Sequence, residues 1–110
     1  MSSGEFVRRE VMSKGKVAGV LRQVIDPELG INIVDMGLLY GIDIDDELKK
    51  IRVEITLSSA GCPMGAAIVG AVENMLDSHF PDSSKNVELV WQPAWSPDYI
   101  SRAGRQQLEE

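Results

Sequence analysis

The stretch Thr56-Leu57-Ser58-Ser59-Ala60-Gly61-Cys62-Pro63-Met64-Gly65 joins two different hydrophobic patterns. Alternating apolar and polar residues end at Leu57, and apolar residues with helical spacing begin after Pro63. Proline suits the first position of a helix, because the N–H that it lacks has no partner there. The stretch is therefore interpreted as the junction between a strand and a helix, and the remaining elements are assigned outward from it.

Two alternating runs precede the junction. The nearer run covers residues 51–58, and its apolar face consists of Ile51, Val53, Ile55 and Leu57. Its polar face consists of Arg52, Glu54, Thr56 and Ser58. A similar run covers about 38–45, and a polar turn separates the two. Two alternating runs joined by a short turn predict an antiparallel hairpin, with the hydroxyls of Thr56 and Ser58 pointing away from the core.

An amphipathic helix is predicted before the hairpin. Its apolar stripe consists of Val17, Val20, Leu21, Val24 and Ile25. Ser13 can cap this helix, and Pro27 ends it because the residue before a proline disfavours helical geometry. A short extra strand near Ile33 would lie in the connection that follows.

Three further elements are predicted after the junction: a helix from Pro63 to about Phe80, a strand over 86–92 and a helix over 97–108. The last helix would bury Ile100, Ala103 and Leu108. Helices and strands are segregated rather than strictly alternating, which is typical of α+β proteins. The sequence therefore predicts a compact two-layer α+β domain, with helices packed on a sheet of three or four strands.

Length and composition limit the classes of protein. A chain of 110 residues forms one domain, expected over 13–110 after a flexible N-terminal segment of residues 1–12. The net charge of −6 argues against a nucleic-acid partner, which requires a basic surface. No apolar run approaches the length of about 20 residues that spans a membrane. A single cysteine and the lack of an apolar leader at the N-terminus favour the cytoplasm.

Cys62 is the strongest candidate for a reactive or metal-binding residue in this sequence. A cysteine at the start of a helix is held as a thiolate by unpaired N–H groups and by the helix dipole, and a thiolate is a nucleophile or a metal ligand. The alternative is a buried cysteine that packs as a small apolar residue. The turn residues Gly61 and Pro63, together with the hydroxyls of Ser58 and Ser59, favour the functional interpretation.

An acidic connection lies between the first helix and the hairpin. It begins with Asp26-Pro27-Glu28 and ends with Asp35-Met36-Gly37. Aspartates beside proline or glycine often bond to neighbouring N–H groups and so form turns. The other interpretation is that a rigid acidic loop supplies carboxylates to a functional site.

Two common types of site are disfavoured. A thiol enzyme needs a base near its nucleophile, but His79, the only histidine, lies on the same predicted helix as Cys62 and would be about 25 Å away. We therefore expect that the protein is not an enzyme, although a dyad across a dimer remains open. Structural zinc sites and iron–sulfur clusters normally have four ligands, and one cysteine leaves most of them unfilled. A labile cluster or iron held by Cys62, with a carboxylate, a small thiol or a second protomer, is compatible with this count.

Four motifs in order resemble the PaaD/SufT-like metal–sulfur cluster assembly family over about residues 13–108. They are Asp26-Pro27-Glu28-Leu29, then Asn32 through Tyr40, then Thr56-Leu57-Ser58 with Gly61-Cys62-Pro63-Met64, and finally Pro93-Ala94-Trp95-Ser96-Pro97 with Ser101 and Ala103. The phenylacetate-degradation members carry a cysteine-rich C-terminal region that this sequence lacks. The resemblance is therefore to the short, SufT-like branch.

The resemblance implies an iron–sulfur assembly fold and a carrier or targeting role in the maturation of iron–sulfur proteins. The assembly machinery and client apoproteins would be its partners. The resemblance assigns the metal ligand to Cys62, the acidic pair to Asp26 and Glu28, and the hydroxyls to Thr56 and Ser58. The alternative is a cluster-free adaptor that docks carriers and clients through the acidic loop and Trp95, although a tryptophan is also often structural. The deficit of ligands per chain predicts a homodimer.

Overall fold

The computed structural model describes residues 13–59 and 65–109. Two parts of the sequence interpretation lie outside the described residues. They are the flexible segment expected at residues 1–12 and the residues Cys62, Pro63 and Met64. The elements, in chain order, are α2 (Lys14–Leu21), β1 (Leu39–Asp45), β2 (Lys50–Ile55), α3 (Gly65–His79), β3 (Ser84–Leu89), the 3₁₀ turn η1 (Pro97–Tyr99) and α4 (Arg102–Glu109).

The described residues form one three-stranded sheet in the order β1-β2-β3. β1 and β2 are antiparallel, which confirms the predicted hairpin, and β3 lies parallel to β2 after the crossover through α3. In place of a fourth strand near Ile33, the described chain has an isolated bridge between Ile25 and Asn32. The α+β class is therefore confirmed, with a mixed sheet and β2 at its centre.

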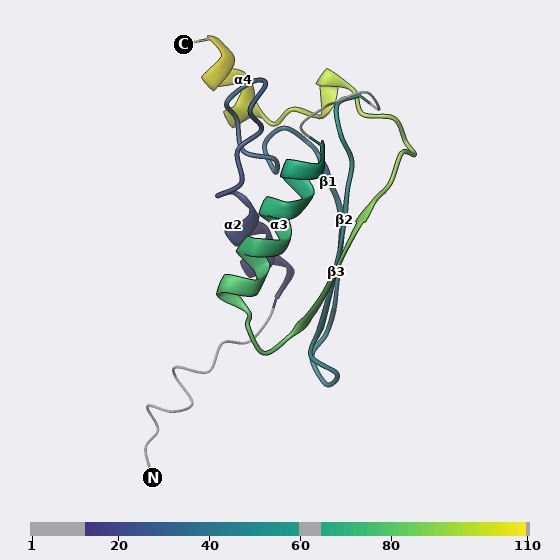
Figure 1. The fold of residues 1–110 in the computed structure, drawn as a ribbon. Helices are drawn as coiled ribbons and strands as arrows, with labels where there is room; N and C mark the ends of the chain where they lie inside the picture. The colour runs from purple at the N-terminus through teal and green to yellow at the C-terminus, as the bar shows by residue number, and fades with distance from the viewer. Residues whose placement is uncertain (1–12, 60–64, 110) are drawn as a thin grey trace.

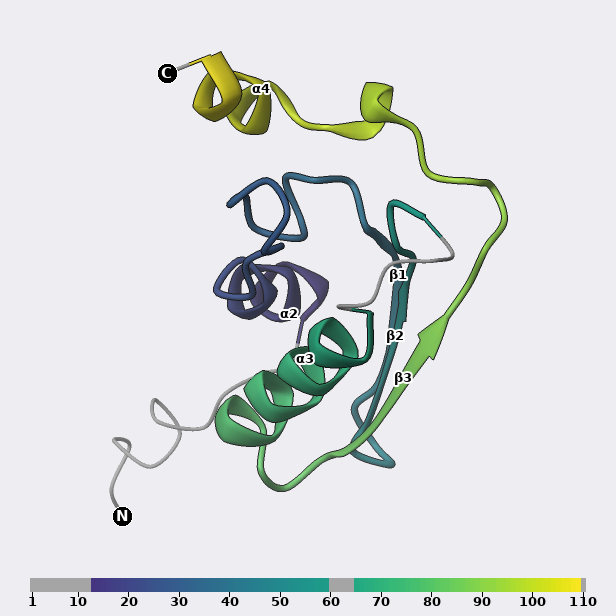
Figure 2. The same cartoon turned by 45° about the horizontal axis from the view of Figure 1, so that its top comes forward.

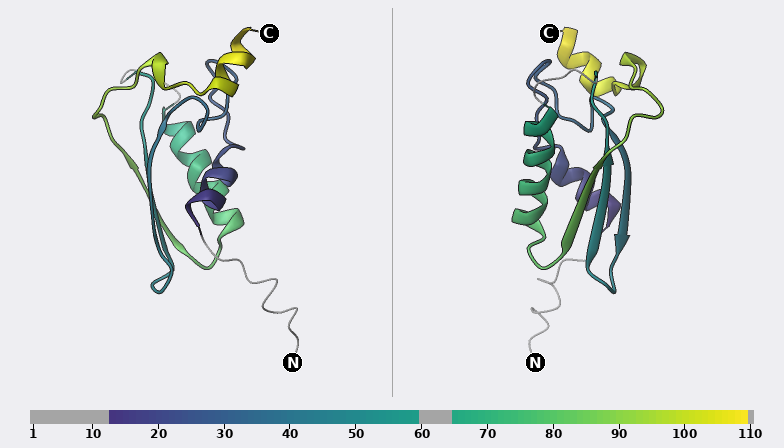
Figure 3. Two further views of the ribbon diagram at one scale, coloured as in Figure 1. Left: turned by 180° about the vertical axis from the view of Figure 1, so that it is seen from behind. Right: turned by 45° about the vertical axis from the view of Figure 1, so that its right-hand side comes forward.

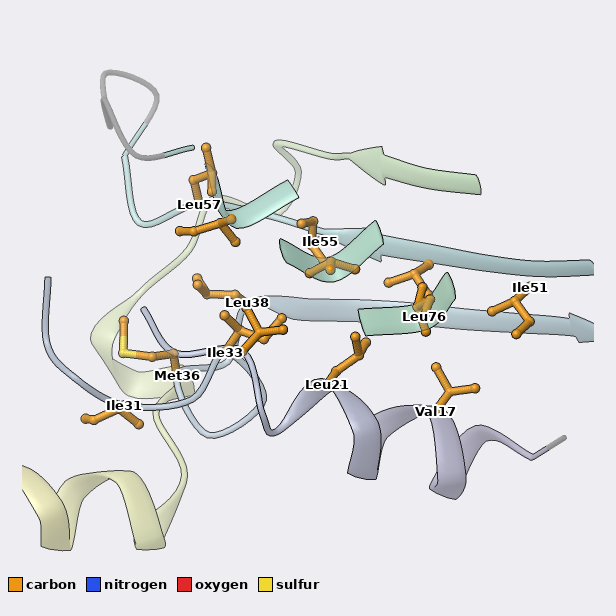
Figure 4. Packing of buried hydrophobic residues seen from close by; sticks show 14 of the residues in the cluster. Val17, Leu21, Ile31, Ile33, Met36, Leu38, Ile51, Ile55, Leu57 and Leu76 are labelled. Atoms are coloured by element: carbon orange, nitrogen blue, oxygen red, sulfur yellow. The ribbon is translucent and has the colours of Figure 1, made fainter. Parts of the chain in front are cut away.

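The helices α2 and α3 lie on the same face of the sheet (Figures 1 and 2). Figure 4 shows Val17 and Leu21 of α2 beside Leu76 of α3, all directed toward the strands. The core also takes apolar side chains from the connection after α2, including Ile31, Ile33 and Met36, each at most 1% exposed. The acidic connection is thus anchored by its own apolar residues, which alternate with its polar ones.

The first helix is shorter than expected. Its start is confirmed, because the Ser13 side chain accepts a hydrogen bond from the Lys16 N–H at 3.1 Å. It ends at Leu21, however, and Ile25, expected in the apolar stripe, is 52% exposed. The Ile33 N–H donates to the Val24 carbonyl, so Val24 bonds to the following connection rather than within a helix.

The C-terminal helix is split. The Ser96 side chain accepts from the Asp98 N–H and so caps η1, but the Ser101 N–H donates to the Asp35 carbonyl. A continuous helix would instead direct that N–H to the Pro97 carbonyl. Ile100 is buried as expected, whereas Ala103 and Leu108 are exposed and the expectation for them was wrong.

Two strands, β2 and β3, end earlier in the chain than predicted. β2 ends at Ile55 rather than at Ser58, and β3 ends at Leu89 rather than at residue 92. Beyond β3 the chain crosses the end of the sheet on its way to α4, as Figure 3 shows from two further sides.

Candidate functional site

Two of the predicted site residues meet where β2 ends. The Ser58 hydroxyl donates to Oε1 of Glu28 at 3.3 Å, although 30 positions separate them. Glu28 belongs to the connection after α2, and Ser58 follows the end of β2. The fold therefore brings the acidic loop against the segment that leads toward Cys62.

Asp26 is used within its own loop. It is 1% exposed, and its Oδ1 accepts the Glu28 N–H at 2.7 Å. The Asp26 carbonyl also accepts the Gly30 N–H, and its N–H donates to the Ile31 carbonyl. This geometry matches the turn alternative for Asp26: its carboxylate fixes the backbone that presents Glu28.

Thr56 is buried just beyond the end of β2. The alternating pattern predicted that it points away from the apolar face, but it is 1% exposed, and its neighbours Ile55 and Leu57 are buried as well. The strand ends at Ile55, so alternation no longer decides which side chain is covered. Oγ1 of Thr56 is a buried polar atom without a hydrogen-bond partner in the described part of the chain. A buried hydroxyl without a hydrogen bond lowers the stability of the folded state, so such groups are rare. This one lies two residues before Ser58, another predicted site residue.

Asp35, for which the sequence suggested a local turn, instead joins distant parts of the chain. Its carboxylate accepts hydrogen bonds from Arg22 at 3.0 Å, from the Asn32 amide at 2.7 Å and from the Ser101 hydroxyl at 2.8 Å. The Asp35 N–H donates to Oδ1 of Asn32, which makes that contact reciprocal. The three-residue spacing of Asn32 and Asp35 was a visible signal, whereas Arg22 and Ser101 required the fold.

These contacts shift the acidity of Asp35. The hydrogen bond from Asn32 is the largest cause that lowers the pKa of Asp35 below its ordinary value of 3.8, and the bonds from Ser101 and Arg22 add to it. Burial opposes the shift, because it disfavours the charged form. The carboxylate is therefore ionised at neutral pH. It links the end of α2, the acidic connection and the start of α4.

Trp95 also has a structural role. Its indole Nε1 donates to the Met36 carbonyl at 2.7 Å, and its side chain is partly buried against the core. This contact fastens the segment after β3 to the end of the acidic loop. The structural alternative for Trp95 is thus supported by geometry.

The predicted iron ligand, Cys62, lies outside the described residues, so only its predicted neighbours can be located in the structure. Within residues 13–59 and 65–109, no group of three histidine, cysteine, aspartate or glutamate side chains is arranged to hold a metal ion. His79 is exposed at the last position of α3, about 21 Å along the helix from its first residue. The oxygen groups of Glu28 and Ser58 are brought together in the described part of the chain.

The sequence matches a family model described as "Iron-sulfur cluster assembly protein" over residues 14–89. It is 46% identical to the Fe-S protein maturation auxiliary factor SufT of Staphylococcus aureus over 79 residues, which are 72% of this chain and 89% of the relative. It is 39% identical to the Fe-S protein maturation auxiliary factor YitW of Bacillus subtilis over 89 residues, which are 81% and 86% of the two chains.

A solved structure has the same fold. The crystal structure of a domain of unknown function from Bacillus anthracis superposes with a TM-score of 0.82 and 37% sequence identity. The match covers 87% of this chain and 91% of that one. The arrangement of helices on one face of the mixed sheet is therefore shared with a known structure.

Proposed function

Because this chain belongs to the iron–sulfur cluster assembly protein family, we propose that it acts as an auxiliary factor in the maturation of iron–sulfur proteins. It binds iron or a labile iron–sulfur cluster as cargo, and it works without catalytic turnover. Assembly proteins that donate the cargo and apoproteins that accept it are its partners. We place this work in the cytoplasm, which the single cysteine of the chain favours. None of the helices in the described part of the chain is long and apolar enough to cross a membrane.

The contact between Glu28 and Ser58 carries the assignment of the site. It joins two residues that the motifs selected separately, at the point where the chain continues toward Cys62. In this proposal Cys62 supplies the thiolate ligand, and Glu28 and Ser58 supply oxygen groups beside it. Asp26 holds the loop of Glu28, and Thr56 offers a hydroxyl that has no partner in the described residues.

Anaerobic reconstitution with ferrous iron and sulfide tests this assignment. We expect visible absorption from bound iron–sulfur species in the wild type, little in Cys62→Ser and a reduced amount in Glu28→Gln. Glu73→Gln is the matched control, because Glu73 is exposed on α3 and the same charge is removed there. Equal absorption in wild type and Cys62→Ser would exclude Cys62 as a ligand.

A cluster-free adaptor is the second candidate. The observation in its favour is that Ile25 and Leu29, on either side of Asp26-Pro27-Glu28, are 52% and 44% exposed and could contact a partner. An adaptor would retain client proteins in pull-down experiments after Cys62→Ser, whereas a carrier would lose transfer of iron to a purified apoprotein. A thiol enzyme would require Cys62 to react with an alkylating agent at pH 7 faster than free cysteine does.

Homodimerisation completes the ligand set in the carrier proposal. One thiolate per chain leaves a cluster mostly without protein ligands, and a second protomer supplies another. Sedimentation should show a dimer in the presence of iron and sulfide. A monomer with and without them would contradict the dimer while leaving the maturation role intact.

A further inference from the structure

A second feature of the molecule lies on the side of the sheet away from the helices. Figures 1 and 2 show that none of the described helices covers this face. At the end of the sheet it contains a groove of about 600 Å³. Its lining consists of Gly37, Leu39, Tyr40, Glu54, Val90, Gln92, Pro93 and Tyr99. None of these residues belongs to the proposed iron site.

The walls of the groove are held in place. The Tyr40 hydroxyl donates to the Pro93 carbonyl at 2.8 Å, and the Tyr40 and Tyr99 rings meet edge to face with centroids 6.3 Å apart. Gly37 has a φ of +80°, and a Cβ there would lie 2.5 Å from the Tyr99 carbonyl oxygen, so η1 packs directly on its backbone. The groove is thus a built feature of the fold, formed where the segment after β3 crosses the sheet.

Glu54 is the one charged residue among those that line this groove. Glu54 pairs through Oε2 with Arg52 at 2.9 Å, and no donor to its Oε1 is recorded in the described residues. Gly41 lies opposite Glu54 in the hairpin, and a Cβ at Gly41 would approach Oε1 to 2.8 Å. The missing side chain of Gly41 therefore leaves space for that oxygen at the groove.

The face beside the groove carries excess negative charge. Arg52 is its central cation, and it contacts three carboxylates, those of Asp43, Glu54 and Glu88. One guanidinium offsets only one of the three charges. A cation that approaches this face is therefore attracted, and the chain as a whole, at −6, adds to that attraction.

We propose that the groove binds an arginine side chain presented by a partner protein. The apolar stem of the arginine would lie along Val90 and Pro93, and its guanidinium would bond to Glu54 while stacking on a tyrosine ring. Arginine suits such a site better than lysine, because its planar group stacks on aromatic faces and is more weakly hydrated. The groove is therefore a docking point for a basic segment, separate from the iron site, and it does not depend on whether iron binds.

The test is a titration of the ¹⁵N-labelled full chain, followed by amide chemical shifts. The probe is a capped pentapeptide with a central arginine between two leucines, and the matched peptide carries neutral citrulline instead. Saturable shifts are expected at Gly37, Gly41 and Glu54 with the arginine peptide. Glu54→Gln should weaken binding roughly tenfold, the factor that corresponds to the loss of one charge-assisted hydrogen bond. Glu73→Gln should change it less than about twofold, as expected of a distant surface charge.

Gly41→Ala provides a second variant, because its Cβ displaces the Glu54 carboxylate without removing the charge. It should also weaken the arginine peptide while leaving the thermal midpoint nearly unchanged. Equal binding of the citrulline peptide, no saturation at millimolar concentration, or equal losses in Glu54→Gln and Glu73→Gln would overturn the proposal. A dimer that Glu54→Gln dissociates and the peptide fails to displace would identify a second copy as the occupant and would also overturn it.

Discussion

The hydroxyl of Ser101 donates to the carboxylate of Asp35 at 2.8 Å, and the Ser101 N–H donates to the Asp35 carbonyl at 2.7 Å. This double contact joins residues 66 positions apart. It ends η1, starts α4 and holds the C-terminal part of the chain against the acidic connection. Figure 2 shows α4 beyond that connection, away from the layer that α2 and α3 form on the sheet.

Replacing Asp35 with alanine should destabilise the protein strongly. The change leaves Asn32, Ser101 and the partly exposed Arg22 without their shared acceptor. Loss of a buried, charged acceptor costs about 3 kcal/mol of unfolding free energy. Urea denaturation measures this. Asp46→Ala, in the exposed hairpin turn, is the control, and a similar loss there would contradict the assigned role of Asp35.

The same carboxylate predicts a dependence on pH. The pKa of Asp35 is lowered in the folded state, chiefly by Asn32, relative to its ordinary value of 3.8. Its stabilising effect is therefore complete above that value and is lost as the pH falls through the lower folded pKa. The gap in unfolding free energy between wild type and Asp35→Asn should shrink as the pH decreases below 3.8. A constant gap from pH 6 to pH 2 would contradict it.

Gly37→Ala should be more harmful than Gly30→Ala. Both glycines have positive φ, +80° and +72°, so alanine is strained at each position. At Gly37 the new Cβ would also meet the Tyr99 carbonyl oxygen at 2.5 Å, whereas nothing lies within 4 Å at Gly30. We expect about 1 kcal/mol of lost stability at Gly30 and an additional 1–3 kcal/mol, roughly, at Gly37 from overpacking. Thermal unfolding of the two variants checks the difference.

Thr56→Val separates stability from function. The variant replaces a buried hydroxyl without a described partner by a methyl group, so the unfolding free energy should rise by about 1 kcal/mol. If the hydroxyl serves the cargo, iron loading should fall in the same variant although its fold is more stable. Thr56→Ser, which keeps the hydroxyl and removes a buried methyl, should lose about 1 kcal/mol and retain loading. A destabilised Thr56→Val would mean that the hydroxyl is bonded in the folded protein.

Much of the fold followed from local patterns. Alternation predicted the hairpin, and helical spacing predicted α2 and α3, because side-chain periodicity is a local property of each element. The ends of the elements were less predictable. β2 stops at Ile55 and η1 separates from α4 at Ser101, where contacts with distant residues compete with the regular pattern.

The candidate site divides in the same way. Asp26 and its turn could be predicted from the proline and glycine that flank the loop, and the motifs selected Glu28 and Ser58. The sequence did not predict that Thr56 is buried, because alternation was extended past the end of the strand at Ile55. Arg22 and Ser101 carried no local signal for their bonds to Asp35, since nothing in a linear pattern specifies which distant loops meet.

The sequence by itself therefore determined the class of fold, the family and the candidate site residues. These depend on periodicity, residue type and short motifs, which need no partner. The tertiary structure alone decided that Glu28 contacts Ser58, that Asp35 joins three segments and that Glu54 faces an aromatic groove. Each of these depends on chain segments that meet only after the hydrophobic core has packed the helices against one face of the sheet.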